Sequence, residues 1–102
     1  MDKREALTLA RQYASIVARE MNPGKIILYG SHAKGDATDE SDIDVAVIFV
    51  NFNGDWFNAY TLLSKLRRSV SSHIEPVLLD SANDRSGFVD ELIKTGEVIY
   101  QH

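Results

Sequence analysis

The chain has 102 residues, of which 44% are hydrophobic and 25% charged, and this size and composition predict one globular domain, residues 1–102, with one modest core. The formal net charge of −4 argues against binding to a long nucleic acid, because such binding depends on Lys and Arg neutralising phosphates. The sequence contains no cysteine, so it offers neither a disulfide nor a cysteine-ligated zinc site.

The N-terminal sequence, Met-Asp-Lys-Arg-Glu, is not followed by the apolar core of a signal peptide. No uninterrupted apolar run approaches the ~18 residues that a membrane-spanning helix needs. We therefore expect a soluble, cytoplasmic protein that does not associate with a membrane.

The first third of the chain predicts a helix, a strand and a short helical turn. Apolar residues recur at three- and four-residue steps over residues 4–21, which indicates an amphipathic helix, and residues 22–24, Asn-Pro-Gly, end it. Residues 25–29 are almost all apolar and predict a strand that is buried on both faces. Glycine then breaks this strand, and residues 31–34 suit one helical turn with the hydroxyl of Ser31 as its N-cap.

The rest of the chain alternates strands and helices. The patterning predicts a polar loop at 35–41, a strand at 43–50, an amphipathic helix at 56–71 and a second strand at 74–80. It then predicts a helix closed by glycine at 86–95 and a last short strand at 97–100. Trp56 and Tyr60 are expected on the apolar face of the amphipathic helix, with Trp56 as a core anchor. Pro76 cannot donate a ladder hydrogen bond, which predicts either an edge strand or a position at the start of the strand. This order places the chain in the α/β or α+β class, with helices packed on a small sheet.

Two aspartates open the strand at 43–50. Asp42 and Asp44 are two residues apart, so their side chains point to the same face of the strand, with Cα atoms ~6–7 Å apart. Ile43 between them should face the core, and nothing about a solvated turn requires two acids around a buried isoleucine. Both carboxylates can reach one cation, and an oxygen-only ligand set favours Mg²⁺ or Mn²⁺ over zinc. The remaining acids of this stretch are interpreted as solvated turn residues: Asp36, Asp39 and Glu40.

The turn that precedes these aspartates suits a phosphate. Gly30 allows the backbone to approach a phosphate closely, and Ser31 offers a hydroxyl and backbone N–H groups at a helix start. His32 and Lys34 are placed either to contact phosphates or to face solvent. A P-loop is excluded, because its Lys and Ser/Thr are absent, and a calcium loop is excluded, because its glycine and glutamate are absent. The turn and the acids together suit in-line attack on a phosphoryl group.

A third carboxylate is expected from an adjacent strand. Glu75 is the candidate, because it is the polar residue in the apolar run that forms the strand at 74–80. The alternative is an acid at a strand end, in water. A basic cluster on the preceding helix is interpreted as a solvated face, with a partner surface as the alternative: Lys65, Arg67 and Arg68.

Three segments together resemble the signature of the minimal nucleotidyltransferases, a family of the DNA polymerase β-like superfamily. They are residues 28–31 (Leu-Tyr-Gly-Ser), 35–37 (Gly-Asp-Ala) and 41–45 (Ser-Asp-Ile-Asp-Val). The family signature is Gly-Ser, ten residues and then Asp-x-Asp, which the sequence from Gly30 to Asp44 matches in spacing.

The resemblance implies the nucleotidyltransferase fold, a small mixed sheet flanked by helices as in the palm of polymerase β. It also implies that Asp42 and Asp44 bind Mg²⁺ and act in catalysis, with Glu75 as the third catalytic and metal-binding acid. Pro76, directly after this third acid, departs from the family pattern.

For the nucleotide, the resemblance implies that Gly30 and Ser31 bind the triphosphate of ATP. Members of the family often carry arginine where this chain has His32 and Lys34. These two residues are therefore expected to bind the phosphates either more weakly or in a different arrangement.

Small stand-alone members of the family look like the antitoxins of toxin–antitoxin pairs, in which the toxin is a HEPN-domain ribonuclease encoded nearby. In such pairs the transferase attaches AMP to a tyrosine of the toxin. The resemblance therefore implies an ATP- and Mg²⁺-dependent protein adenylyltransferase, in a homo- or hetero-oligomer. Two other functions stay open: a non-catalytic, nucleotide-binding antitoxin or scaffold that acts by contact, and a catalytic subunit that modifies a small molecule.

Overall fold

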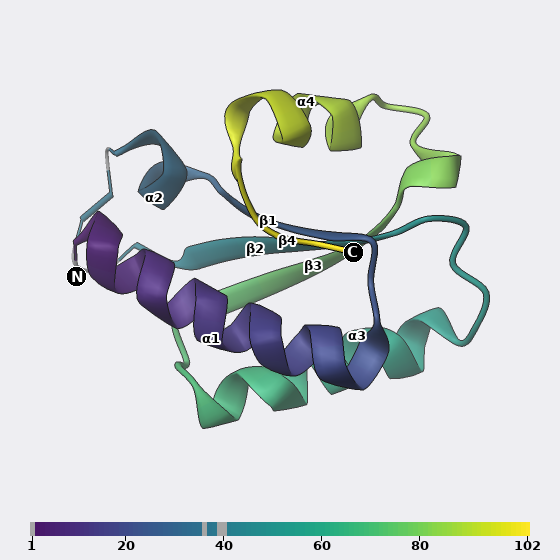
Figure 1. Ribbon diagram of the computed structural model, residues 1–102, viewed down its shortest axis with the longest axis horizontal. Helices are drawn as coiled ribbons and strands as arrows, with labels where there is room; N and C mark the ends of the chain where they lie inside the picture. The colour runs from purple at the N-terminus through teal and green to yellow at the C-terminus, as the bar shows by residue number, and fades with distance from the viewer. Residues whose placement is uncertain (1, 36, 39–40) are drawn as a thin grey trace.

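The computed structural model describes residues 2–35, 37–38 and 41–102, and helices alternate with strands along the chain (Figure 1). The elements are α1 (Lys3–Met21), β1 (Lys25–Tyr29), α2 (Ser31–Lys34), β2 (Ile43–Phe49), α3 (Trp56–Leu66), the 3-10 turn η1 (Arg67–Ser69), β3 (Ile74–Asp80), the 3-10 turn η2 (Ser81–Asn83), α4 (Phe88–Thr95) and β4 (Glu97–Gln101).

The strands form one mixed sheet of four strands in the order β3-β2-β1-β4. β1 runs antiparallel to β2 and to β4, whereas β2 and β3 are parallel. A parallel pair needs a crossover connection, which α3 supplies. β3 lies at an edge of the sheet, which is one of the two positions that Pro76 predicts. The mixed sheet with its flanking helices confirms the predicted fold class.

Helices cover both faces of the sheet: α1 and α3 lie on one face and α4 on the other (Figure 1). Successive strand residues point to opposite faces, so neighbouring residues of β1 and β2 enter two different cores. The core under α1 and α3 includes Tyr13, Val17, Ile26, Leu28, Ile43, Val45, Val47 and Leu63. The core under α4 consists of Ile27, Ala46, Ile48, Val89 and Leu92. β1 and β2 are thus covered on both faces, and by this alternation Asp44 points to the α4 face.

Capping and one buried hydrogen bond fix α1. The side chain of Asp2 accepts a hydrogen bond of 2.8 Å from the backbone N–H of Glu5, and Asn22 ends the helix in the left-handed region with φ of 55°. The hydroxyl of buried Tyr13 donates to the carbonyl of Leu63 at 2.7 Å, which ties α1 to α3. Burial raises the pKa of Tyr13 well above its usual value, so the phenol stays protonated.

The helix predicted at 56–71 is shorter in the structure and continues as the 3-10 turn η1. Leu63 is buried, but Trp56 and Tyr60 are 45% and 46% exposed, so the prediction that Trp56 anchors the core is wrong. Trp56 instead contacts Phe52 edge to face, with ring centroids 5.4 Å apart. The reason is that α1 and α3 share one face of the sheet, so only one stripe of α3 reaches the core (Figure 1).

The other boundaries differ little from those predicted. α4 begins at Phe88, two residues later than expected, because Gly87 takes up the left-handed region with φ of 74°. β2 ends before Val50, which is 73% exposed, and β4 extends to Gln101. Within the described residues, no helix has the length and apolar character to cross a bilayer.

Candidate active site

The ends of three adjacent strands bring the predicted acids to one end of the sheet. In the register of the strands, Asp44 of β2 lies between Tyr29, the last residue of β1, and Glu75, the second residue of β3. The expectation that Glu75 lies on a strand next to the aspartates is confirmed, whereas its role as a third metal-binding acid stays a prediction. Asp42 directly precedes β2 and is exposed, and Ile43 is fully buried, as predicted.

The carboxylate of Asp44 lies against the glycine of the Gly-Ser turn. A Cβ placed on Gly30 would collide with Oδ2 of Asp44 and would lie 3.2 Å from its Cγ. Gly30 also has φ of 76° and ψ of −151°, a conformation that is essentially restricted to glycine. Glycine is therefore required here twice, for its backbone conformation and for the close approach of the acid.

The Gly-Ser turn leads into α2, a single helical turn. Gly30 is its N-cap, without a side-chain hydrogen bond, and Ser31 is the first helical residue. The prediction that the hydroxyl of Ser31 caps the helix is therefore wrong, because the unusual backbone of Gly30 moves the helix start by one residue. The backbone N–H groups of Lys34 and Gly35 bond to the carbonyls of Gly30 and Ser31, at 3.1 and 3.0 Å.

His32 and Lys34 point in different directions. Lys34 is exposed, whereas His32 has no exposed surface, so a solvent-facing role for His32 is wrong. Nε2 of His32 lies 3.4 Å from the carbonyl oxygen of Ser41, the residue before Asp42. His32 thus joins α2 to the segment that carries the first acid. The roles of His32 and Lys34 toward a nucleotide stay predictions.

The acids at this end of the sheet repel one another. The pKa of Asp44 is raised by burial first, then by the charges of Asp42 and Glu75, while His32 lowers it slightly. Burial and the charge of Asp44 also raise the pKa of Tyr29, its partner on β1. In the absence of a cation, concentrated negative charge therefore disfavours ionised Asp44.

Glu75 makes a contact that sequence analysis did not predict. Nη1 of Arg67 lies 3.2 Å from Oε1 of Glu75 and donates to the carbonyl oxygen of Ile74 at 2.9 Å. The sequence pattern predicts that Arg67 belongs to a solvated helix face or to a partner surface. No sequence pattern predicts the contact of Arg67 with Glu75, because this contact depends on how the chain turns between η1 and β3.

The donor set at this end of the sheet fits one hard divalent cation. Asp42 and Asp44 offer oxygen ligands only, and a cation would relieve the repulsion that raises the pKa of Asp44. No group of three His, Cys, Asp or Glu side chains among the described residues is placed to hold a metal, so the cation-binding role of Glu75 stays a prediction. The predicted solvated turn acids lie outside the described residues: Asp36, Asp39 and Glu40.

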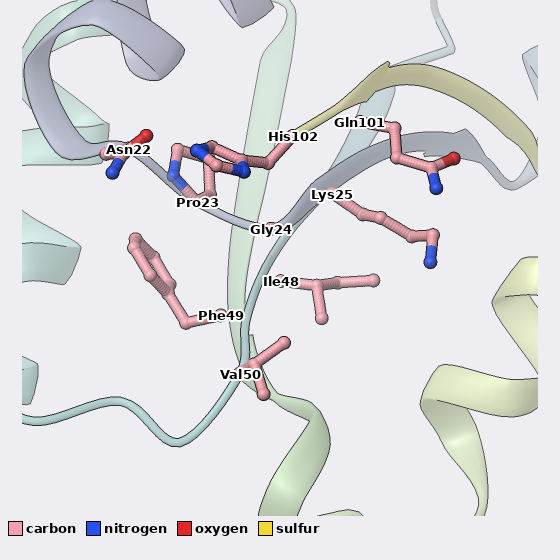
Figure 2. A pocket seen from close by; sticks show the side chains of 9 residues that line it. All are labelled: Asn22, Pro23, Gly24, Lys25, Ile48, Phe49, Val50, Gln101 and His102. Atoms are coloured by element: carbon pink, nitrogen blue, oxygen red, sulfur yellow. The ribbon is translucent and has the colours of Figure 1, made fainter.

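Two cavities lie at the opposite end of the sheet. The one shown in Figure 2 has a volume of about 450 Å³ and is formed around Lys25, Ile48 and the C-terminal residues, with no Asp or Glu in its lining. The second, of about 640 Å³, is lined by aromatic residues of the β2–α3 connection and α4, including Phe52 and Phe88. Neither cavity contains a residue of the predicted site.

The sequence profile of the family described as "Polymerase beta, Nucleotidyltransferase" matches residues 11–102. Two proteins of Methanocaldococcus jannaschii, each named "Putative protein adenylyltransferase", are similar to the chain. One is 34% identical over 77 residues, which are 74% of this chain and 77% of that protein. The other is 36% identical over 56 residues, which are 55% of this chain and 56% of that protein.

Solved structures share the fold. A nucleotidyltransferase of Sulfolobus solfataricus, described as putative, matches 98% of this chain and 84% of its own with a TM-score of 0.71 and 22% identity. A toxin–antitoxin crystallised with AMP-PNP matches 90% of this chain and 73% of its own, with a TM-score of 0.65 and 22% identity. The mutant toxin–antitoxin MntA-HpeT matches 100% of this chain and 75% of its own, with a TM-score of 0.58 and 18% identity. From the profile match and the closeness of the first relative, the chain belongs to the polymerase beta nucleotidyltransferase family and is a nucleotidyltransferase.

Proposed function

We propose that this nucleotidyltransferase is a Mg²⁺-dependent protein adenylyltransferase that moves AMP from ATP onto a tyrosine of a partner protein. The observation that carries the proposal is the placement of Asp44, against Gly30 of the Gly-Ser turn and in register with Glu75. This placement supports a triphosphate site and a cation site that would lie side by side. Protein as the acceptor is supported by the names of the two relatives.

In this proposal each part of the site has one task. Gly30, Ser31 and backbone N–H groups of the turn would bind the triphosphate, while Asp42 and Asp44 would hold the cation. Bound Mg²⁺ supplies charge neutralisation for the phosphates. The acceptor oxygen forms a bond to the α-phosphorus, the bond to the β-phosphate oxygen breaks, and pyrophosphate leaves. Glu75, which pairs with Asp44 in the strand register, is proposed as the third acid, which would join the cation and accept the proton of the hydroxyl.

We further propose that the partner is a HEPN-domain ribonuclease toxin encoded nearby, which the modification silences, and that both proteins act in the cytoplasm as a hetero-oligomer. Support comes from the two toxin–antitoxin structures that share the fold, one of them crystallised with AMP-PNP. The chain would then be the antitoxin.

The test is to incubate the purified chain with Mg²⁺, each labelled nucleoside triphosphate in turn, and the product of the neighbouring gene. We expect label from ATP on a tyrosine of that protein, with a mass increase of one AMP, and loss of labelling with EDTA. The matched control is Asp42→Asn/Asp44→Asn, which should bind the partner without labelling it. An unchanged partner mass with both proteins would contradict the proposal.

An assay of toxin neutralisation, run beside the labelling experiment, separates the two other functions. If the double variant neutralises the toxin as well as wild type does, the chain acts by contact. Label that appears on a small molecule from a cell extract, and not on the partner, would identify a catalytic subunit for small-molecule modification.

A further inference from the structure

Arg67 holds two groups at the start of β3. Its Nη1 donates to the carbonyl oxygen of Ile74 at 2.9 Å and lies 3.2 Å from Oε1 of Glu75. Arg67 directly follows α3, so one guanidinium nitrogen connects the end of that helix with the backbone and the carboxylate of the edge strand. Glu75 is thereby held near the backbone of its own strand.

This contact gives Glu75 a partner other than the two aspartates. Asp44 and Glu75 are direct neighbours in the register of β2 and β3, yet no three acidic or histidine side chains among the described residues are grouped to hold a metal. A carboxylate that is paired with Arg67 is directed toward a fixed positive charge of the protein. It is then less available to a cation beside Asp42 and Asp44.

We propose that Arg67 is the built-in counter-ion of Glu75 and competes with a divalent cation for this carboxylate. Arg67 would thus be a positioning residue that sets the cation concentration at which Glu75 joins the site. The inference rests on the metal-binding role proposed for Glu75. It assigns Arg67 a task that its place in a basic cluster did not indicate.

The ion pair of Arg67 with Glu75 is weak enough for a cation to displace Arg67. The side chains of Arg67 and Glu75 are 32% and 50% exposed, and water weakens ion pairs at such sites. Removing a pair of this kind should strengthen a competing interaction of its carboxylate by about two- to fivefold. The second hydrogen bond of Arg67, to Ile74, is independent of the cation and should keep Arg67 in place.

The binding test uses the full chain without nucleotide or acceptor, and measures free Mn²⁺ by electron paramagnetic resonance. Wild type should show a tighter site that requires Asp44 and a weaker one that requires Glu75. Arg67→Gln should tighten the weaker site about two- to fivefold. The matched control is Arg68→Gln, which removes an exposed charge one residue away and should leave both sites unchanged. In an Arg67→Gln/Glu75→Gln double variant, the tightening should disappear.

A second measurement avoids any effect of substitution on folding. In wild type, the guanidinium ¹⁵N resonance of Arg67 should shift as Mg²⁺ fills the weaker site, while that of Arg68 should not. The inference is overturned if the weaker site of folded Arg67→Gln is unchanged or loosened, or if the Arg67 resonance does not respond. If Asp44→Asn loses Mn²⁺ binding and one of these two contradicting results is also found, only the role of Arg67 is rejected and the metal site stands. Unchanged Mn²⁺ binding in Asp42→Asn/Asp44→Asn would instead reject the metal site of the proposed function.

Discussion

The carboxylate of Asp44 packs directly on Gly30, although thirteen other residues separate the two in the chain. Gly30 directly follows β1, and Asp44 lies in β2. The antiparallel pairing of Tyr29 with Asp44 brings the turn and the acid together. The family signature therefore reports a contact in space. Its Gly-Ser part and its Asp-x-Asp part form one surface because β1 and β2 are neighbours.

We predict that Gly30→Ala disrupts this surface. Its Cβ would collide with the carboxylate of Asp44, and alanine is strained at the backbone angles of Gly30. Strain of this kind costs about 1–3 kcal/mol, so chemical denaturation should show a lower free energy of unfolding. Transfer of nucleotide should fall further than stability does, because Asp44 is displaced.

Gly35→Ala provides the matched control. Gly35 also has positive φ, 83°, but a Cβ there meets no atom of the described residues within 4 Å. This variant should lose stability through backbone strain and retain nucleotidyl transfer. Equal activity losses in the two variants would show that strain in α2, and not contact with Asp44, determines the effect of Gly30→Ala.

We predict that Asp44→Asn stabilises the fold while it strongly reduces transfer. Burial and the neighbouring acids raise the pKa of Asp44 above its usual 3.8, so its ionised form is less favourable in the folded chain than in the unfolded one. The resulting loss of stability begins as pH rises above about 3.8 and is complete above the raised pKa. At neutral pH in EDTA, Asp44→Asn should therefore melt at a higher temperature than wild type.

Two measurements check that ionised Asp44 destabilises the folded chain. The difference in melting temperature between Asp44→Asn and wild type should shrink as pH falls toward 3.8. Mg²⁺ should raise the melting temperature of wild type and have little effect on the variant, because a ligand stabilises only the state that binds it. Transfer should fall by about 100-fold or more. Loss of a residue that only hydrogen-bonds to a metal ligand costs up to about 100-fold, and Asp44 is proposed as a ligand itself. A variant less stable than wild type at neutral pH in EDTA would contradict the electrostatic argument.

The sequence predicted those features that local patterns determine. The apolar runs at 25–29 and 43–50 correspond to strands covered on both faces, and the spacing of Asp42 and Asp44 about Ile43 predicted which residue is buried. Glu75 was correctly expected on a neighbouring strand because it opens an apolar run.

The features that sequence analysis missed depend on packing between distant segments. Trp56 is exposed because α1 already covers much of its face of the sheet, and His32 is buried because α2 lies against the segment before β2. The contact of Arg67 with Glu75 depends on the turn between η1 and β3. None of these is a property of periodicity or composition.

We predict that Tyr13→Phe weakens the fold without affecting transfer. The Tyr13 hydroxyl makes one buried hydrogen bond, to the carbonyl of Leu63, which also accepts from the backbone N–H of Arg67. Its loss should cost about 0.5–1.5 kcal/mol of unfolding free energy, measured by urea denaturation. Thr61→Val, which removes an exposed hydroxyl bonded within α3, should cost less. A loss of activity in folded Tyr13→Phe would indicate that α1 acts on the site as well as on stability.

We predict that Asp80 makes the fold sensitive to acid. Burial alone would raise the pKa of Asp80, but hydrogen bonds from Ala82, Asn83, Phe52 and Asn51 outweigh it and lower the pKa. Stabilisation by this carboxylate is therefore present above its usual pKa of 3.8 and disappears as pH falls through the lowered value. Asp80→Asn should melt at a lower temperature at neutral pH, and its stability should decline less between pH 5 and pH 2.

Asp90→Asn, an exposed acid in the first turn of α4, is the matched control for this charge change. Because Asp80 fixes the β2–α3 connection to η2 at the end of the sheet away from Asp44, its loss should leave transfer at neutral pH unchanged. If Asp80→Asn and wild type lose stability in parallel on acidification, the backbone donors do not favour the charged form and the pH dependence originates elsewhere.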